Sequence, residues 1–139
     1  MHLVTINPKD KQLASAISGN QNCMMVYDMT LKLYERMGYR EPWIGYFLQE
    51  DEQYIGSCGF KGEPQSGRIE LAYFTFPEFE GKGFATEMCR MLLTIAMEAQ
   101  PTILVTARTL PQENASTRIL VKNGFTLQGT IHDPEDGEV

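Results

Sequence analysis

Two glycines on either side of a lysine, Gly81 and Gly83, are the residues of this sequence best suited to approach a ligand. They stand between a segment rich in β-branched and aromatic residues and a segment with helical periodicity. Glycine has no Cβ, so backbone N–H groups at such a turn can come close to a bound group. The first N–H groups of a helix are unpaired and carry partial positive charge, which favours an anion such as phosphate. The pattern therefore predicts an anion site just before Phe84.

A strand–turn–helix–strand unit must position this turn. Residues 69–76 have the composition of a strand, and Pro77 ends it because proline cannot donate to a ladder. From Phe84 on, apolar residues recur with helical spacing. This stripe consists of Ala85, Met88, Leu92, Ile95, Ala96 and Ala99. The apolar run 103–105 then predicts a parallel strand covered on both faces, reached by a right-handed crossover. Ligands bind such units at the carboxyl ends of the strands, where the two glycines stand.

The rest of the chain predicts further strands and helices around this unit. We expect a short strand at 3–6, helices over 9–17 and 21–37, an antiparallel hairpin of 43–49 with 53–62, a helix from 114 to about 122, and a strand over 125–132. Gly56 and Gly59 within the hairpin indicate a close backbone approach or a bulge. Together these elements predict an α+β fold with a mixed, mostly antiparallel sheet.

Composition places the chain among ordinary globular proteins. Its 139 residues favour one domain over 1–139, and a formal net charge of −6 argues weakly against nucleic-acid binding. The three cysteines give neither a disulfide framework nor a metal-spaced cluster, so we expect no metal and reduced, cytoplasmic thiols. No apolar run is long enough to span a membrane, and the first residues lack the form of a signal peptide.

Two ordered blocks of residues resemble one known family. The first is PEFEGKGFATE at 77–87, and the second is LPQENASTRIL at 110–120, which continues through Lys122 to Phe125. A weaker third block covers 55–62, and the resemblance extends over about two-thirds of the chain. The blocks resemble the GNAT N-acetyltransferases, which move an acetyl group from acetyl-CoA to an amine. Within the family they are most similar to the branch that acetylates the N-terminal amine of ribosomal proteins.

Rival glycine motifs do not match. A phosphate loop requires Gly-x-x-x-x-Gly-Lys-Ser/Thr, which is absent, and a dinucleotide fingerprint requires a third Gly or Ala where Thr86 stands. The sequence also departs from the GNAT pattern. The family usually has Gln or Arg three residues before the first glycine, but here that residue is Glu78, an unfavourable charge beside a diphosphate unless it points away. The family's final strand, which lies beside the parallel strand at 103–105, is expected to be missing.

The resemblance implies a three-layer GNAT-like fold with a central parallel β-α-β site for acetyl-CoA, and it implies which residues bind that donor. These are Phe74, Thr75, Phe76, Gly81, Lys82, Gly83, Phe84, Ala85, Thr86, Asn114 and Ser116. The backbone around the two glycines would hold the diphosphate, and the strand edge at 74–76 would pair with the pantetheine arm. An N–H near Phe74 or Phe76 would stabilise the thioester oxygen as it becomes negative.

Catalysis requires a neutral amine. A carboxylate that removes a proton from the amine through a water molecule is sufficient. Glu70 is the candidate base, because alternation places it on the same face as Phe74; the alternative is that it pairs with a surface cation. Glu87 is a second carboxylate, although a cap or an ion pair suits it better. No tyrosine follows position 73 to act as general acid, so Ser116, His132 or solvent would serve. Ser116 could equally cap a helix or contact CoA.

The sequence thus predicts a cytoplasmic N-acetyltransferase that transfers acetyl from acetyl-CoA directly to a protein N-terminus or a small amine in a ternary complex. The alternative is a non-catalytic, regulatory GNAT-fold protein that binds acyl-CoA. An open sheet edge at the C-terminal end would invite a second copy of the chain, so a homodimer is a further expectation.

Overall fold

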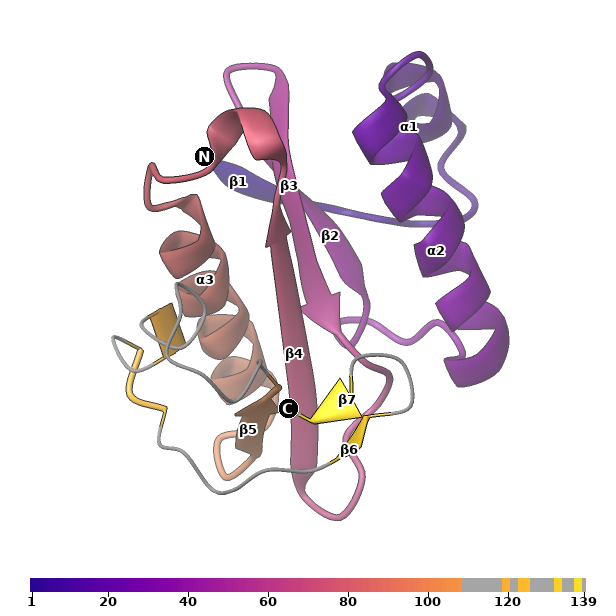
Figure 1. Cartoon of the computed structure of the whole chain (residues 1–139). Coiled ribbons are helices and arrows are strands. Elements are labelled where there is room, and N and C mark those ends of the chain that lie inside the picture. Colours follow the sequence, from indigo (N-terminus) through magenta and orange to yellow (C-terminus); the bar gives the residue numbers. More distant parts are fainter. Residues whose placement is uncertain (109–118, 121–122, 126–131, 134–136, 139) are drawn as a thin grey trace.

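The computed structural model describes residues 1–108, 119–120, 123–125, 132–133 and 137–138, and a mixed sheet with helices on both faces organises them (Figure 1). The elements are β1 (His2–Thr5), α1 (Lys11–Ala16), α2 (Gln21–Met37), β2 (Gly45–Glu50), β3 (Gln53–Phe60), β4 (Arg68–Thr75), the 3₁₀ turn η1 (Pro77–Phe79), α3 (Phe84–Ala99), β5 (Leu104–Ala107), β6 (His132–Asp133) and β7 (Gly137–Glu138). The predicted α+β class is confirmed.

The main sheet has the order β1-β2-β3-β4-β5. Its first four strands are antiparallel neighbours, whereas β4 and β5 are parallel, as the strand–helix–strand pattern predicted. Between β2 and β3 the register shifts, because Leu48 faces Gly56 and the next residue, Gln49, faces Tyr54. Ile55 is therefore an extra residue on β3, which is the bulge that the glycine-containing hairpin indicated.

The close backbone approach predicted for the hairpin glycines is also confirmed. A Cβ on Gly56 would lie 2.4 Å from the carbonyl oxygen of Phe74, and a Cβ on Gly59 would lie 2.6 Å from that of Ile44. Contacts this short are sterically excluded, so only glycine allows the neighbouring strands to reach these positions.

Two hydrophobic clusters fix the three layers. On one face of the sheet, α3 buries Met88, Cys89, Leu92 and Ala96 against strand residues such as Leu71. On the other face, the α1–α2 segment buries Leu13, Ile17 and Cys23 against Phe47 and Phe76. Figure 1 shows α1 and α2 on the side of the sheet opposite α3. Cys89 is fully buried, as expected for a small apolar residue of the central helix.

One prediction about β5 is wrong. We expected both faces of this strand to be buried under other elements, but the side chain of Leu104 is 51% exposed. The reason is position, because β5 is the last strand of the main sheet in the described part of the chain. An apolar run of three residues does not distinguish a central strand from an edge strand.

Helix boundaries follow the sequence signals closely. The helix α2 has the predicted bounds, and Gly38 ends it with a φ of 85°. The helix α1 begins later than expected, because the Asp10 side chain accepts a hydrogen bond from the Leu13 N–H and so caps it. Gly124, with a φ of 89°, provides the predicted glycine after the helical residues Ile119 and Leu120.

The chain after residue 108 is described only in part. Most of the helix predicted from residue 114 and most of the strand predicted over 125–132 lie outside the described residues. The short strands β6 and β7 pair with each other in an antiparallel sheet of their own. The main sheet thus ends at β5 among the described strands. None of the described helices has the length and apolar character needed to cross a membrane.

Candidate active site

The turn between β4 and α3 has the backbone that the two glycines predicted. Gly81 and Gly83 have φ values of 77° and 85°, in the left-handed region that favours glycine. A Cβ built on either residue would have no described atom within 4 Å. The turn is therefore an open backbone surface at the carboxyl end of β4.

The N-terminus of α3 differs from those of the two other described α-helices. The side chains of Asp10 and Asn20 cap α1 and α2, whereas Gly83 caps α3 and offers no side-chain acceptor. The N–H groups at the start of α3, at Ala85 and Thr86, thus have no side-chain cap. Unpaired donors beside positive-φ glycines fit a diphosphate, so these residues suit the group that CoA would bring.

Aromatic rings brace this turn from both ends. The rings of Phe79 and Phe84 meet edge to face, with centroids 6.5 Å apart. The Lys82 ammonium lies 5.9 Å from the centroid of the Phe79 ring, within cation–π range. The turn therefore adds a positive charge to the backbone donors at the start of α3.

Strand β4 extends beyond its described pairing with β5. The described pairing of the two strands ends at Leu71 with Ala107, but β4 continues to Thr75. Backbone groups alternate in direction along a strand, and the even-numbered residues of β4 point toward β3. Two hydrogen bonds show this: Lys61 N–H donates to Glu70 O, and Phe76 N–H donates to Ile55 O, each at 2.9 Å. The N–H and C=O of Thr75 consequently point the other way, beyond the end of the β4–β5 pairing.

This alternation corrects the expected position of the oxyanion donor. An N–H near Phe74 or Phe76 was expected at the open edge, but Phe76 donates its N–H to β3 and Phe74 has the same direction. The odd-numbered Thr75 has the direction that a thioester oxygen or a pantetheine amide requires. The Phe74 side chain is 41% exposed on the face opposite α3, so contact between its ring and a ligand stays a prediction.

Glu70 lies between two cations. Its Oε2 atom is 2.7 Å from Lys61 Nζ, and its Oε1 atom is 3.3 Å from Arg108 Nε. The side chain is 19% exposed, and the buried Oε2 receives no well-aligned hydrogen bond, so the contact with Lys61 is Coulombic. Glu70 therefore pairs with cations, which was the alternative interpretation of this residue. Its role as a base stays a prediction.

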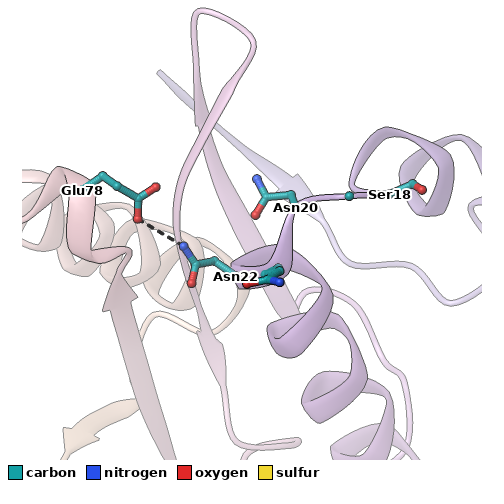
Figure 2. A pocket seen from close by; sticks show the side chains of 6 residues that line it. Ser18, Asn20, Asn22 and Glu78 are labelled. Carbon is teal, nitrogen blue, oxygen red and sulfur yellow. Dashed lines mark hydrogen bonds between the residues drawn. The ribbon is translucent and has the colours of Figure 1, made fainter.

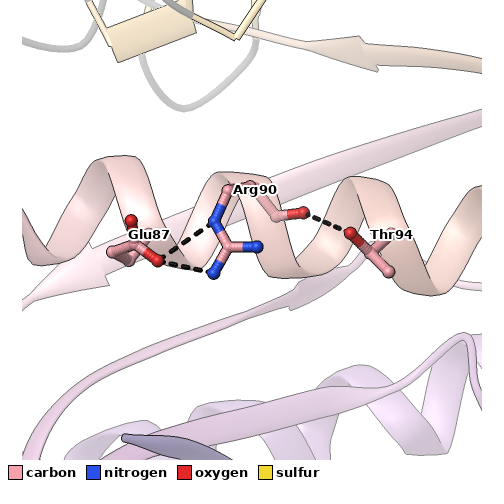
Figure 3. Close-up of polar contacts among 3 residues, drawn as sticks. All are labelled: Glu87, Arg90 and Thr94. Atoms are coloured by element: carbon pink, nitrogen blue, oxygen red, sulfur yellow. Dashed lines mark hydrogen bonds and ion pairs between the residues drawn. The ribbon is translucent and has the colours of Figure 1, made fainter.

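Glu87 also pairs with a cation, as its sequence position indicated. Figure 3 shows Arg90 donating from Nε and from one terminal nitrogen to Glu87 Oε2, at 3.1 and 2.7 Å. The hydroxyl of Thr94 donates to the carbonyl of Arg90 one turn later. An acid in the first turn of α3 is favourable because the helix dipole is positive there. Glu87 thus pairs with Arg90 and stabilises the start of α3.

A contact that was not foreseen joins the turn to α2. Figure 2 shows Glu78 of η1 directed toward the start of α2, where the Asn22 side-chain amide donates to Glu78 Oε1 at 3.2 Å. The two residues border an open polar depression of about 620 Å³, which Ser18, Gly19, Asn20 and Gln21 complete. The departure from the family's Gln or Arg at Glu78 was the available signal, but spacing could not identify a partner 56 residues away.

Most of the second sequence block lies outside the described residues. Asn114 and Ser116 lie outside the described residues, and of His132 only its place in β6 is described. Among the described residues no group of three His, Cys, Asp or Glu is arranged to hold a metal ion. The described site thus consists of the glycine turn, the part of β4 beyond Leu71, and Glu70 with Lys61 and Arg108.

Comparison with known proteins identifies the family to which this arrangement belongs. The family model for the acetyltransferase (GNAT) domain matches residues 2–126. The chain belongs to the GNAT acetyltransferase family. A curated relative, the uncharacterized N-acetyltransferase p20 of Bacillus licheniformis, is 28% identical over 89 residues, which are 63% of this chain and 50% of p20. This GNAT chain spans between 50% and 62% of the length of the curated relatives that it matches.

Solved structures show the same fold at low identity. A spermidine N-acetyltransferase SpeG chimera from Vibrio cholerae and hSSAT matches 96% of this GNAT chain and 86% of its own, with a TM-score of 0.68 and 14% identity. RimL, a ribosomal L7/L12 alpha-N-protein acetyltransferase in complex with coenzyme A, matches 82% of this chain and 63% of its own, with a TM-score of 0.61 and 20% identity. These similarities establish the GNAT fold alone.

Proposed function

We propose that this chain is an acetyl-CoA-dependent N-acetyltransferase that transfers the acetyl group directly to a primary amine. The observation that carries the proposal is the open turn at Gly81 and Gly83, followed by a helix start without a side-chain cap. It lies at the end of a strand whose described pairing with β5 ends at Leu71. These features provide a diphosphate site and an adjoining strand edge for an amide-bearing arm.

The residues have separate roles in this proposal. The N–H groups at Gly83, Ala85 and Thr86 hold the diphosphate, with Lys82 adding positive charge. An extended arm then runs from the turn along the edge of β4, where the Thr75 N–H donates to an amide of the arm. Glu70 lies five residues before Thr75, about 17 Å along the strand, so in this proposal the arm continues past Thr75 and its acetyl end lies next to Glu70.

Glu70 is the proposed base in the transfer. It takes a proton from the amine through a water molecule, the amine nitrogen bonds to the acetyl carbon, and the C–S bond breaks. The thiolate of CoA leaves and takes up a proton from Ser116, His132 or solvent, since a thiolate is a stable leaving group near neutral pH. An N-terminal α-amine requires less help than a lysine, because their pKa values are about 7.7–8.0 and 10.4.

The acceptor is a primary amine, either a protein N-terminus or a small amine. The similar structures include an alpha-N-protein acetyltransferase and a spermidine N-acetyltransferase, so both acceptor types occur among proteins of this fold. The formal net charge of −6 suits a cationic acceptor over an anionic one.

A second candidate function is acyl-CoA binding without catalysis. The pairing of Glu70 with both Lys61 and Arg108 favours it, because two cations compensate the carboxylate that would serve as base. The sequence also has no tyrosine after Tyr73 to act as general acid. The two functions share the diphosphate turn and differ in turnover.

Two measurements on the full chain test the proposal. Calorimetry with CoA measures binding, and thiol release from acetyl-CoA with a panel of peptides and small amines measures turnover. We expect CoA binding together with thiol release that depends on at least one amine. Binding without turnover on every amine would support the non-catalytic function, and absence of binding would overturn both.

Matched glycine variants show whether the turn is responsible. Gly83→Ala should weaken CoA binding by at least tenfold, because a side chain at a φ of 85° distorts the backbone donors. Gly67→Ala is the control, since Gly67 has a φ of 74° and open space around it but precedes β4 at the other end of the strand. Equal loss of binding in both variants would mean that general destabilisation, and not the turn, is the cause.

A further inference from the structure

The contact between Asn22 and Glu78 determines where a negative charge lies relative to the proposed diphosphate turn. Glu78 stands three residues before Gly81, so its carboxylate is close in sequence to a turn suited to a doubly charged diphosphate. A carboxylate directed at such a turn would repel the ligand, and the repulsion would grow where water is excluded. Figure 2 shows that the carboxylate is instead directed toward α2.

Two features of α2 keep Glu78 in this direction. The Asn22 amide donates to Glu78 Oε1 at 3.2 Å. In addition, the first turn of α2 contains no acidic residue of its own, so the positive end of its dipole is free to attract a carboxylate from another element. Glu78 thus supplies the acid that α2 lacks, while Asn22 fixes its position.

We propose that Asn22 is a positioning residue of the acyl-donor site, which acts by holding the Glu78 carboxylate away from the diphosphate turn. This inference rests on the proposed function, because it assumes that the turn binds CoA. It assigns a role in donor binding to the start of α2, an element that the glycine motif does not include. Asn22 itself contacts Glu78 and no reacting atom.

A double-mutant cycle on CoA binding tests the inference. Asn22→Ala should raise the Kd for CoA about three- to tenfold at low ionic strength, because the released carboxylate turns toward the diphosphate. Glu78→Gln should leave the Kd unchanged or lower it. In the Glu78→Gln background, Asn22→Ala should have no further effect, because the charge has been removed.

Additional readouts separate this electrostatic role from a purely structural one. Raising the salt concentration should reduce the defect of Asn22→Ala, since screening weakens repulsion between exposed charges. In turnover assays, Asn22→Ala should raise the KM for acetyl-CoA and leave kcat unchanged. Gln21→Ala is the matched control, because Gln21 is the neighbouring amide residue and borders the same depression.

The outcomes distinguish the inference from the proposed function. If the wild-type chain binds CoA but Asn22→Ala binds it equally well, the inference alone is overturned. An equal loss of affinity from Asn22→Ala with and without Glu78 would also overturn it, because the loss would then be structural. If the wild-type chain does not bind CoA, the proposed function fails first and the inference fails with it.

Discussion

The hydroxyl of Tyr34 accepts a hydrogen bond from the backbone N–H of Gly45 at 2.9 Å. The same hydroxyl donates to the carbonyl of Ile6, also at 2.9 Å. Gly45 O accepts a bond from Ile6 N–H, so these two residues form half of a strand pair and Tyr34 completes the other half. A side chain of α2 is thereby built into the ladder of β1 and β2, which anchors the helix to the sheet.

Tyr34→Phe should lower the free energy of unfolding by about 1–3 kcal/mol, because it leaves two partly buried backbone groups without their partner. Urea unfolding at pH 7 measures the change. Tyr39→Phe is the control, since its hydroxyl makes only an exposed contact with Glu41 at 3.1 Å, and it should change stability by no more than about 0.5 kcal/mol. Equal losses in both variants would contradict the role of the inserted hydroxyl.

Gly56→Ala should destabilise the fold by about 1–3 kcal/mol or more, because a methyl group there meets the carbonyl of Phe74. The strain falls on the β3–β4 pairing next to the open edge, so CoA binding should weaken as well. Thermal unfolding and calorimetry measure the two effects. Ser57→Ala on the same strand should change stability by only a few tenths of a kcal/mol; a Gly56 variant as stable as this control would disprove the close approach.

Glu70→Gln should lower kcat by about 10²- to 10⁴-fold if Glu70 is the base, since a glutamine cannot accept the proton. The Kd for CoA should stay the same, because Glu70 lies away from the diphosphate turn. Lys61→Met serves as the comparison, because it removes one ion-pair partner of Glu70 and keeps the carboxylate. An unchanged rate in Glu70→Gln would make Glu70 a structural residue and would favour the non-catalytic function.

Stability should fall in alkaline solution because of buried thiols. Burial raises the pKa of Cys23 and of Cys89 from 9.0 to about 11. In the unfolded chain these thiols lose their protons near pH 9, whereas in the folded chain they keep them until about pH 11. The unfolded state therefore binds fewer protons in this window, so the stability present below pH 9 is lost as the pH rises through it.

Urea unfolding between pH 8 and pH 10.5 measures this dependence, and we expect a loss of about 4 kcal/mol from the two thiols together. Cys23→Ala should make the dependence shallower by removing one of the two groups. A free energy of unfolding that is constant from pH 8 to pH 10.5 would contradict the effect of burial on the pKa of these two thiols.

Local signals were sufficient to predict much of this molecule. The bounds of α2, the start of α3 and the strand–helix–strand unit follow from apolar spacing and from glycines, because those signals act within one or two turns. The identity of the edge strand could not be predicted in this way. Leu104 looks like a core residue in the sequence, and its exposure depends on which strand, if any, lies beside β5.

The site shows the same division. The turn at Gly81 and Gly83 was predicted from the sequence, because two glycines between a strand pattern and a helix pattern are a local signal. The direction of the N–H groups at Phe74, Thr75 and Phe76 depends on the register between β3 and β4, which composition does not determine. The partners of Glu70 and Glu78 come from other elements, so only the folded chain reveals them.

The alternation of side chains along β4 also determines which positions of the strand tolerate substitution. Ile69 and Leu71 face α3 and are 2% and 1% exposed, so few substitutions are tolerated at either position. Ala72 and Phe74 belong to the opposite face and remain accessible, so selection can change them without disturbing the interior. One strand thus combines a buried side, where a substitution disturbs the interior, with an accessible side, where it does not.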